Sequence, residues 1–288
     1  MQNNSRPREV QGSEAMEIEF GARSDVGRAR GNNEDSFAIA ADLNLFVLSD
    51  GMGGLAAGEA ASRLTTETVV NNCRAAASNP SLPLIGEHLA GLSSSSNRLA
   101  SAIRTANREV YAVAKKNERK RGMGATVVAV WIFDSQRASV AHVGDSRVYR
   151  LRGGEFAQIT EDHSFVADQV RRGLMTRQEA AQSNMQSVLL RALGVEPEVQ
   201  VDVTEKDLME GDTFLLCSDG LTRELSNAQI SATLTEIENP QHAAEQLIDL
   251  ANQAGGGDNI TAVVARYAPK PVRSFARIGK WFKGSEER

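Results

Sequence analysis

Acidic residues recur at the ends of strongly apolar segments of this chain, and this pattern limits what the chain can fold into. Three apolar runs lead into an aspartate and a fourth aspartate precedes another run: 45–49 before Asp50, 138–144 before Asp145, 214–218 before Asp219, and Asp258 ahead of 260–267. A strand that is apolar on both faces is buried, so the residue at its end lies at the rim of a core. Several carboxylates at one rim repel one another unless cations lie between them. The pattern therefore predicts a metal site.

The ligand types indicate which metal such a site would hold. A single Asp-Gly pair is usually only a solvated turn, so the prediction depends on the recurrence of the aspartates. Oxygen ligands without a cluster of histidines or cysteines favour Mg²⁺ or Mn²⁺ over zinc. The four histidines stand singly in the sequence, at His88, His142, His163 and His242.

The composition is that of a soluble globular protein. Of the 288 residues, 41% are hydrophobic and 24% are charged. The net charge of −5 argues against nucleic acid as the main partner, and no apolar run reaches the roughly 18 residues of a transmembrane helix. Cys73 and Cys217 are the only cysteines, which suits a reducing cytoplasm. Residues 1–16 lack the apolar core of a secretory signal and are expected to form a disordered leader.

Hydrophobic periodicity predicts strands and helices in mixed order. Strands are expected at 18–22, 36–41, 43–49, 125–133, 138–143, 148–151, 199–203, 213–218 and 259–267. Helices are expected at 59–72, 97–118, 228–234 and 242–253. The serines at 93–96 can cap the second of these helices.

The connections between these elements indicate the fold class. Several are short enough for hairpins, so we expect largely antiparallel sheets in a layered α/β (α+β) sandwich. No break in composition divides residues 17–267, which predicts one domain. Residues 163–187 are polar and poor in core residues, and we expect them to leave the sheet as a small flap.

Two short motifs suggest other chemistry. Residues 51–56 fit the dinucleotide pattern G-x-G-x-x-A, although Asp50 would place a carboxylate beside the pyrophosphate. Residues 217–223 have the C-x₅-R spacing of phosphatases that use a thiolate nucleophile. Asp219 would oppose a phosphate dianion in that loop, and Cys217 suits a small apolar strand position. The thiolate alternative stays open because it predicts the same reaction by other means.

Six motifs occur in an order that is typical of one family. They are RARGNNEDS at 28–36, DGMGG at 50–54, GMGAT at 122–126, GDSR at 144–147, SDG at 218–220 and GDN at 257–259. As a set they resemble the metal-dependent protein phosphatases of the PP2C (PPM) type, and the DGMGG form resembles the bacterial branch. The resemblance covers about residues 17–267. It implies a four-layer α-β-β-α sandwich, in which helix pairs flank two central antiparallel sheets and two metals lie in a channel at one end.

The resemblance also implies which residues bind the metals. Asp50 would bridge both ions and the Gly51 carbonyl would bind one of them. Asp219 and Asp258 would complete the ligands of the other ion. The ions expected are Mn²⁺ or Mg²⁺, two per site.

Further residues of this chain match positions that surround the metal ions in the family it resembles. Glu34 and Asp35 would hold metal-bound waters, at or just behind the ligands. Asp145 together with Asp219 matches the place of a third, weaker metal. Arg30 matches the arginine that grips the substrate phosphate, where a guanidinium can bind two oxygens at once.

Three positions qualify these expectations. Many eukaryotic members of the family have a histidine where this chain has Met52, so that candidate general acid is missing. Arg223 stands where some members have an acid that helps to hold the third metal, which puts that metal in question. His163 could be offered as an acid, but a structural capping role is the interpretation we favour.

Together these features predict a hydrolase that removes phosphate from phosphoserine and phosphothreonine in proteins. Two cations would share one water and lower its pKa, and the resulting hydroxide would attack phosphorus in line. The resemblance alone implies an opposing Ser/Thr protein kinase as partner, and we expect a monomer. The competing hypothesis is a catalytically silent binding module. Loss of a metal carboxylate would favour it, and Asp50, Asp219 and Asp258 are all present.

The C-terminal segment 268–288 differs from the rest of the chain. It carries six basic and two acidic residues. Phe275, Ile278 and Phe282 follow the spacing of a short apolar helix face. Docking to a membrane surface or to a partner helix is one interpretation, and a loosely ordered solvated tail is the one we favour.

Overall fold

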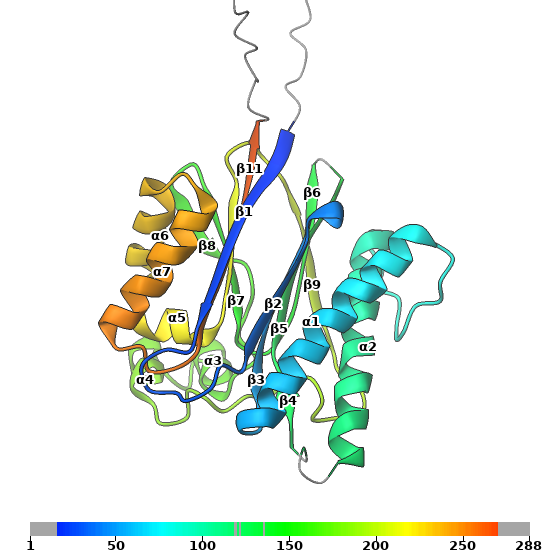
Figure 1. The fold of residues 1–288 in the computed structure, drawn as a ribbon, viewed down its shortest axis with the longest axis horizontal. Coiled ribbons are helices and arrows are strands. Elements are labelled where there is room, and N and C mark those ends of the chain that lie inside the picture. The colour runs from blue at the N-terminus through cyan, green and yellow to red at the C-terminus, as the bar shows by residue number, and fades with distance from the viewer. Residues whose placement is uncertain (1–15, 118–119, 121, 135, 270–288) are drawn as a thin grey trace, which may run out of the picture.

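A computed structural model describes residues 16–117, 120, 122–134 and 136–269, and these residues form two sheets packed face to face with helices outside them (Figure 1). The first sheet has the strand order β1-β11-β10-β7-β8. Its strands are β1 (Met16–Asp25), β11 (Ile260–Pro269), β10 (Thr213–Cys217), β7 (Arg147–Arg152) and β8 (Glu155–Gln158). Strand β1 pairs with β11 along its whole length, although the two lie at opposite ends of the sequence.

The second sheet has the strand order β2-β3-β5-β6-β9. Its strands are β2 (Asp35–Ala40), β3 (Leu45–Met52), β5 (Val127–Asp134), β6 (Arg137–Val143) and β9 (Asp202–Asp207), and the two-residue β4 (Gly124–Ala125) pairs with the end of β3. A short 3-10 helix, Ala41–Leu43, joins β2 to β3. Throughout the described residues, the paired strands of both sheets run antiparallel, as the short connections predict.

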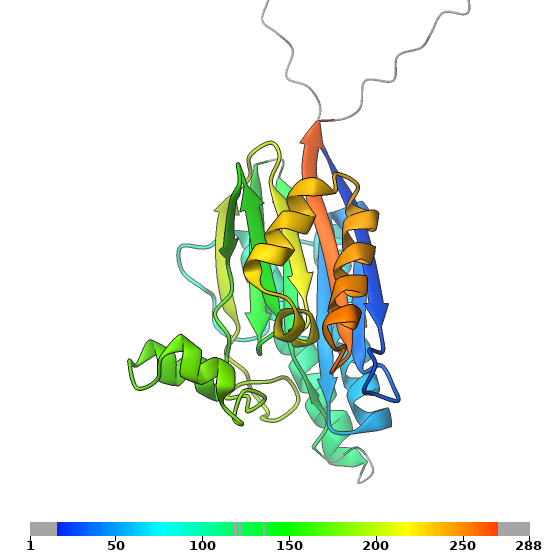
Figure 2. The same cartoon turned by 90° about the vertical axis from the view of Figure 1, so that its left-hand side faces the viewer.

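Helices cover the outer face of each sheet. Helices α1 (Leu55–Ser78) and α2 (Ser94–Lys116) lie on the second sheet. Helices α5 (Asp219–Glu224), α6 (Asn227–Glu236) and α7 (Pro240–Ala254) lie on the first. Figure 2 shows the remaining pair, α3 (Phe165–Arg171) and α4 (Arg177–Gln182), beside the lower end of the sheets. The expected four-layer α-β-β-α sandwich is confirmed.

The central strands are apolar throughout because both of their faces are buried. On β10, Phe214 and Leu216 belong to the core between the sheets, while Leu215 packs toward α5, α6 and α7. On β3, Phe46 faces the other sheet and Leu45 faces α1 and α2. Each strand therefore contributes to two cores, which fixes its register and the position of the residue that follows it.

Some predicted element limits are wrong. The strand expected at 199–203 is β9, which begins only at Asp202. Val199 and Val201 pack against the core in the connection that precedes the pairing with β6. Strand β8 and helix α5 were not expected. The predicted serine cap is confirmed, since the Ser93 side chain accepts a hydrogen bond from the N–H of Ser96.

Other expectations concern the limits of the domain. The leader at 1–16 and the tail at 268–288 fall almost wholly outside the described residues. The single domain at 17–267 and the flap at 163–187 stay predictions, although α3 and α4 fall within the latter range. Within residues 16–117, 120, 122–134 and 136–269, no helix combines the length and the apolarity that crossing a membrane requires.

The core between the sheets gives a stability prediction. Leu216 is fully buried there, whereas Leu174 is 70% exposed. We expect Leu216→Ala to lower the free energy of unfolding by about 2–5 kcal/mol, because it removes buried methyl groups and leaves a cavity. Leu174→Ala makes the same chemical change and should stay within about 0.5 kcal/mol of the parent. Urea unfolding followed by circular dichroism measures both, and equal losses would contradict this description of the core.

Candidate active site

The aspartates that follow apolar runs meet at one end of the two sheets. Asp50 lies on β3, Asp145 follows β6, Asp219 opens α5 and Asp258 precedes β11. They surround a cavity of about 240 Å³. All predicted site residues except one line this cavity: Arg30, Glu34, Asp50, Gly51, Asp145, Asp219 and Asp258.

The exception is Asp35, which pairs with Asp50 across β2 and β3 and lies behind the cavity wall. Its Oδ2 accepts hydrogen bonds from the hydroxyls of Ser218 (2.8 Å) and Thr261 (2.7 Å). Its Oδ1 is buried and finds no hydrogen-bond partner among the residues that the structure describes. Burial, reinforced by the charges of Asp219 and Asp258, raises the pKa of Asp35 to about 7, although the two hydroxyls lower it.

Close backbone packing brings Glu34 to the same place. A Cβ on Gly51 would lie 2.1 Å from the carbonyl oxygen of Gly58, and a Cβ on Gly58 would lie 1.8 Å from Oε2 of Glu34. Only glycine therefore allows the end of β3, the start of α1 and the Glu34 side chain to approach this closely. Burial raises the pKa of Glu34, with the charges of Asp258 and Glu59 adding to the effect and Arg30 opposing it.

The gathered carboxylates destabilise one another's ionised forms. Burial is the largest cause that raises the pKa of Asp50, and the charges of Asp35, Asp219 and Asp145 add to it. Burial and the charge of Asp219 likewise raise the pKa of Asp145 to about 7. The pKa of Asp219 is raised by burial, and the nearby Arg223 reduces that shift. These groups need protons or cations to balance their charge at neutral pH.

The donor set fits divalent cations that prefer oxygen ligands. Oδ1 of Asp219 and Oδ1 of Asp35 are both buried, and neither has a hydrogen-bond partner in the described part of the chain. Buried polar atoms are normally satisfied, so two orphaned carboxylate oxygens in one cluster fit a site that binds a cation. Carboxylates and a backbone carbonyl suit Mg²⁺ or Mn²⁺.

Two arginines offset part of the negative charge. Arg30 binds both oxygens of Asp258, through Nε and through a terminal nitrogen, each at 2.9 Å. Arg223 lies 2.5 Å from Oδ2 of Asp219 and 3.3 Å from Oδ2 of Asp258. Arg30 therefore lies in the cavity, as expected. It pairs there with Asp258, one of the expected metal ligands, and its guanidinium is not free to bind a phosphate.

Two residues that position the site were missed in the sequence. The Asn259 side chain accepts a hydrogen bond from the N–H of Glu34 and donates to the carbonyls of Val26 and Asn32, which fixes the loop that carries Arg30. The Thr126 hydroxyl accepts a hydrogen bond from the N–H of Asp50. Asn259 ends the GDN motif at 257–259 and Thr126 ends the GMGAT motif at 122–126. Their places in these motifs are the sequence feature that could have identified them.

The structure disfavours the thiolate alternative. Cys217 is fully buried among the residues that join the first sheet to α5 and α7, away from the cavity. Burial raises the pKa of its thiol to about 12, so a thiolate is not available at neutral pH.

The structure also disfavours the dinucleotide alternative. The motif at 51–56 follows β3, whose partners β2 and β5 both run antiparallel to it. A dinucleotide fold needs a parallel βαβ unit at this point.

His163 lies in a separate cluster. The capping role expected for it is wrong in detail, because the neighbouring Ser164 caps α3. The His163 ring accepts a hydrogen bond from the N–H of Gly144 and lies 3.2 Å from Asp202. Arg191 contacts that Asp202 carboxylate at 2.6 Å and already supplies a cation there.

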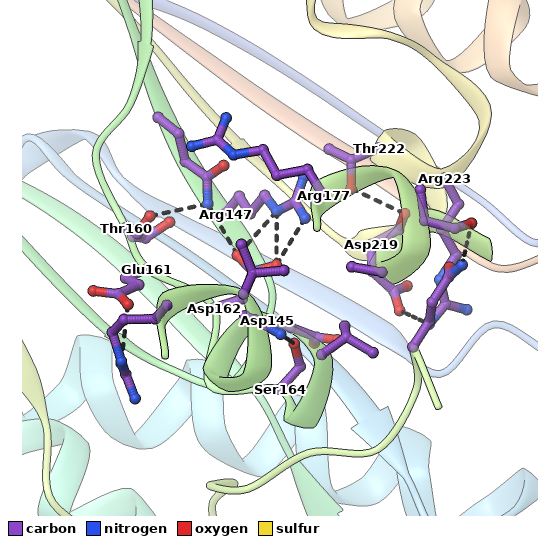
Figure 3. Close-up of a pocket in the computed structure, with 18 of the residues that line it drawn as sticks. Asp145, Arg147, Thr160, Glu161, Asp162, Ser164, Arg177, Asp219, Thr222 and Arg223 are labelled. Carbon is purple, nitrogen blue, oxygen red and sulfur yellow. Dashed lines mark hydrogen bonds and ion pairs between the residues drawn. The ribbon is translucent and has the colours of Figure 1, made fainter. Parts of the chain in front are cut away.

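A larger cavity adjoins the first. It has a volume of about 770 Å³ and lies between α3, α4 and the end of the first sheet (Figure 3). Asp145, Asp219 and Arg223 line both cavities. A group held at the carboxylate cluster can therefore extend into this larger space.

The sequence of residues 28–252 matches the family described as protein phosphatase 2C. The chain is 39% identical over 248 residues to the serine/threonine protein phosphatase PstP of Mycobacterium tuberculosis, covering 86% of this chain and 45% of PstP. It is 34% identical over 252 residues to the serine/threonine phosphatase stp of Listeria innocua, covering 86% of this chain and 95% of that relative. The chain thus spans less than half the length of the mycobacterial relative.

Solved structures agree with these matches. A crystal structure of M. tuberculosis PstP superimposes with a TM-score of 0.72 at 39% identity, covering 86% of this chain and 98% of that one. The PstP catalytic domain in complex with two manganese ions gives a TM-score of 0.74 at 37% identity, covering 88% and 100%. Most of the chain is covered by the sequence match and by both superpositions. This chain belongs to the protein phosphatase 2C family.

Proposed function

We propose that this protein is a metal-dependent phosphatase that hydrolyses phosphoserine and phosphothreonine in proteins. The observation that carries the proposal is the cluster of buried carboxylates, two of them with unpartnered oxygens, in a cavity that also contains Arg30. The names of the similar proteins, serine/threonine phosphatases, support this substrate class. A catalytically silent module is not favoured, because the expected metal ligands Asp50, Asp219 and Asp258 are all present.

We assign the metal ligands by position in this cluster. Asp50 would hold both cations, the Gly51 carbonyl would help to hold one of them, and Asp219 with Asp258 would hold the other. The PstP domain that holds two manganese ions supports a two-metal site of Mn²⁺ or Mg²⁺. When bound, such cations supply a water of lowered pKa as the nucleophile and neutralise charge on the phosphoryl oxygens.

The remaining acids have supporting roles in this proposal. Glu34 lines the cavity and Asp35 lies behind it, so both can orient waters. Asp145 and Asp219 form the candidate site of a third, weaker metal. Because Arg223 lies 2.5 Å from Asp219, its guanidinium would compete with a cation at that position.

Arg30 binds the substrate phosphate in this mechanism. Its fork of donors suits two phosphoryl oxygens. Asp258 would pair less tightly with Arg30 when it also holds a cation, and the Arg30 guanidinium could then bind the phosphate. Met52 lines the same cavity, and its thioether has no proton to give the leaving group.

The cellular setting is part of the same proposal. Phosphorylated proteins are the substrates, and an opposing Ser/Thr protein kinase is the proposed partner. We also propose that the protein acts as a monomer in the cytoplasm. Cys73 and Cys217 are free and buried, which is compatible with a reducing compartment.

A metal-dependence assay tests the reaction itself. We expect turnover of p-nitrophenyl phosphate with Mn²⁺, its loss in EDTA, and no effect of iodoacetamide, because the Cys217 thiol is buried. Cys217→Ala should retain activity. Metal-independent turnover that iodoacetamide abolishes would restore the thiolate mechanism. Absence of turnover under every condition would favour the silent module.

Removal of a ligand tests the metal site independently of turnover. Mn²⁺ at about 100 times its Kd should raise the free energy of unfolding by about 2.7 kcal/mol, and Asp219→Asn should abolish this gain together with activity. Without metal, Asp50→Asn should be at least as stable as the parent, because it removes a repelled charge. Calorimetric titration and thermal unfolding measure both effects.

The matched control for the ligand variants is Asp42→Asn. Asp42 lies on the surface, where it pairs with Arg74, and its side chain is 58% exposed. This variant should keep the full response to Mn²⁺. An unchanged response in Asp219→Asn would overturn the ligand assignment.

Replacement of Arg30 tests phosphate binding. Arg30→Ala should weaken inhibition by inorganic phosphate roughly tenfold to hundredfold, which corresponds to the loss of about 1.5–3 kcal/mol of charged hydrogen bonding. Calorimetry should show that Mn²⁺ still binds. If the inhibition constant for phosphate stayed the same, Arg30 would have no role in holding the phosphoryl group.

A further inference from the structure

The larger cavity is the place where the rest of a protein substrate can lie. The cavity at the carboxylate cluster has a volume of only about 240 Å³, enough for a phosphorylated side chain but not for the polypeptide that carries it. The adjoining groove of about 770 Å³ begins at the shared residues Asp145, Asp219 and Arg223. It therefore offers the nearest space for residues that flank the phosphorylated one.

Most charged side chains of this groove already have partners. Arg147 donates three hydrogen bonds to Asp162, the shortest at 2.7 Å. Arg171 pairs with Glu161 at 2.9 Å and also contacts Asp168. These pairs leave little net charge along this part of the groove.

Arg177 is the exception. Within the described residues, its side chain takes part in no hydrogen bond or ion pair. Figure 3 draws it among the lining side chains, and no interaction line joins it to another residue. Among the described residues that line it, the groove thus has one guanidinium that is free to bind an anion supplied by another molecule.

The backbone at Arg177 is well defined. Arg177 is the first residue of α4, and its neighbour Thr176 forms a capping box with Glu179. The Thr176 hydroxyl accepts a hydrogen bond from the N–H of Glu179 at 3.2 Å, and the Glu179 carboxylate accepts one from the N–H of Thr176 at 2.7 Å. This arrangement fixes the start of the helix.

Apolar side chains form part of the flap-side wall, beside the polar Ser164 and Gln186 and the paired Arg171. They include Val166, Val170 and Ala180, from α3 and α4. Such a wall suits the backbone and aliphatic side chains of an extended peptide, while Arg177 supplies the one charge that discriminates among sequences.

We propose that Arg177 is a specificity-determining residue that binds a carboxylate side chain of the substrate, close in sequence to the phosphorylated residue. The inference rests on the proposed function, since it assumes that a phosphoprotein occupies the adjoining cavity. It assigns to this protein a preference for phosphorylated segments that contain an aspartate or glutamate in the stretch seated in the groove.

A set of phosphopeptides tests the inference on the full chain with Mn²⁺. The reference peptide has only neutral residues around its phosphoserine, and each other peptide places one glutamate at one flanking position. At one or more positions, glutamate should raise kcat/KM about two- to fivefold, the effect of a solvent-exposed ion pair. Arg177→Ala should reduce this ratio to one. Arg177→Glu should invert it in favour of lysine at the same position.

Arg172→Glu is the matched control. Arg172 belongs to the same flap and carries the same charge, but it pairs with Asp168 and does not line the groove. This variant should keep the parent's preference for glutamate. The inference is overturned if no glutamate position matters, if Arg177→Ala keeps the parent ratio, or if Arg172→Glu changes the ratio equally.

Failure of the proposed function is distinguishable from failure of this inference. Turnover of p-nitrophenyl phosphate reports the catalytic centre of the parent and of each variant. If the parent hydrolyses no phosphate ester, the proposed function fails and the labelled phosphopeptides stay intact. The Kd of each phosphopeptide is then measured by fluorescence anisotropy. The inference holds if the glutamate peptide binds the parent more tightly than the neutral peptide does, and if Arg177→Ala removes this difference.

Discussion

Repulsion among carboxylates at one end of two sheets is the constraint on which the rest of this structure depends. Burial and mutual charge raise the pKa of Asp35 and Asp145 to about 7 and raise that of Asp50 as well. Such an arrangement opposes folding, so other parts of the molecule must hold the acids together. The double-sided burial of β3 and β10 provides this force, because each strand packs into the core between the sheets and into the core beneath the helices.

The counter-charges reach the acids from two sides. Arg30 comes from the loop before β2, which Asn259 holds against the rim of the first sheet, and Arg223 comes from the last turn of α5. Both guanidinium groups contact Asp258. The same residues that lower repulsion in the absence of metal thus stand where metal and phosphate are proposed to bind. In that proposal, exchange of partners at Asp258 links metal binding to the freeing of Arg30.

The sequence predicts those parts of the fold and the site that depend on local patterns better than those that depend on tertiary packing. The central strands and the layered sandwich followed from long apolar runs with short connections. The start of β9 could not be predicted in this way, because alternating valines pack on the core both before and after the residue at which β9 begins to pair with β6. Helix α5 was missed because Asp219-Gly220 is also a common turn sequence. Of the site residues, Asp35 was expected near the metals, yet its place behind the wall depends on the pairing of β2 with β3.

The sequence by itself determined the chemistry available to this protein: aspartates at the ends of buried strands, a DGMGG turn whose glycines permit close packing, and a chain long enough for two cores. These features are local, so periodicity and spacing reveal them. Only the tertiary structure decided that Arg30 pairs with Asp258, that Arg223 also reaches Asp258, that Cys217 is buried in the core, and that Arg177 lines a groove without a partner among the described residues. Each of these depends on how separate elements lie relative to one another, and the sequence does not state the distances between them.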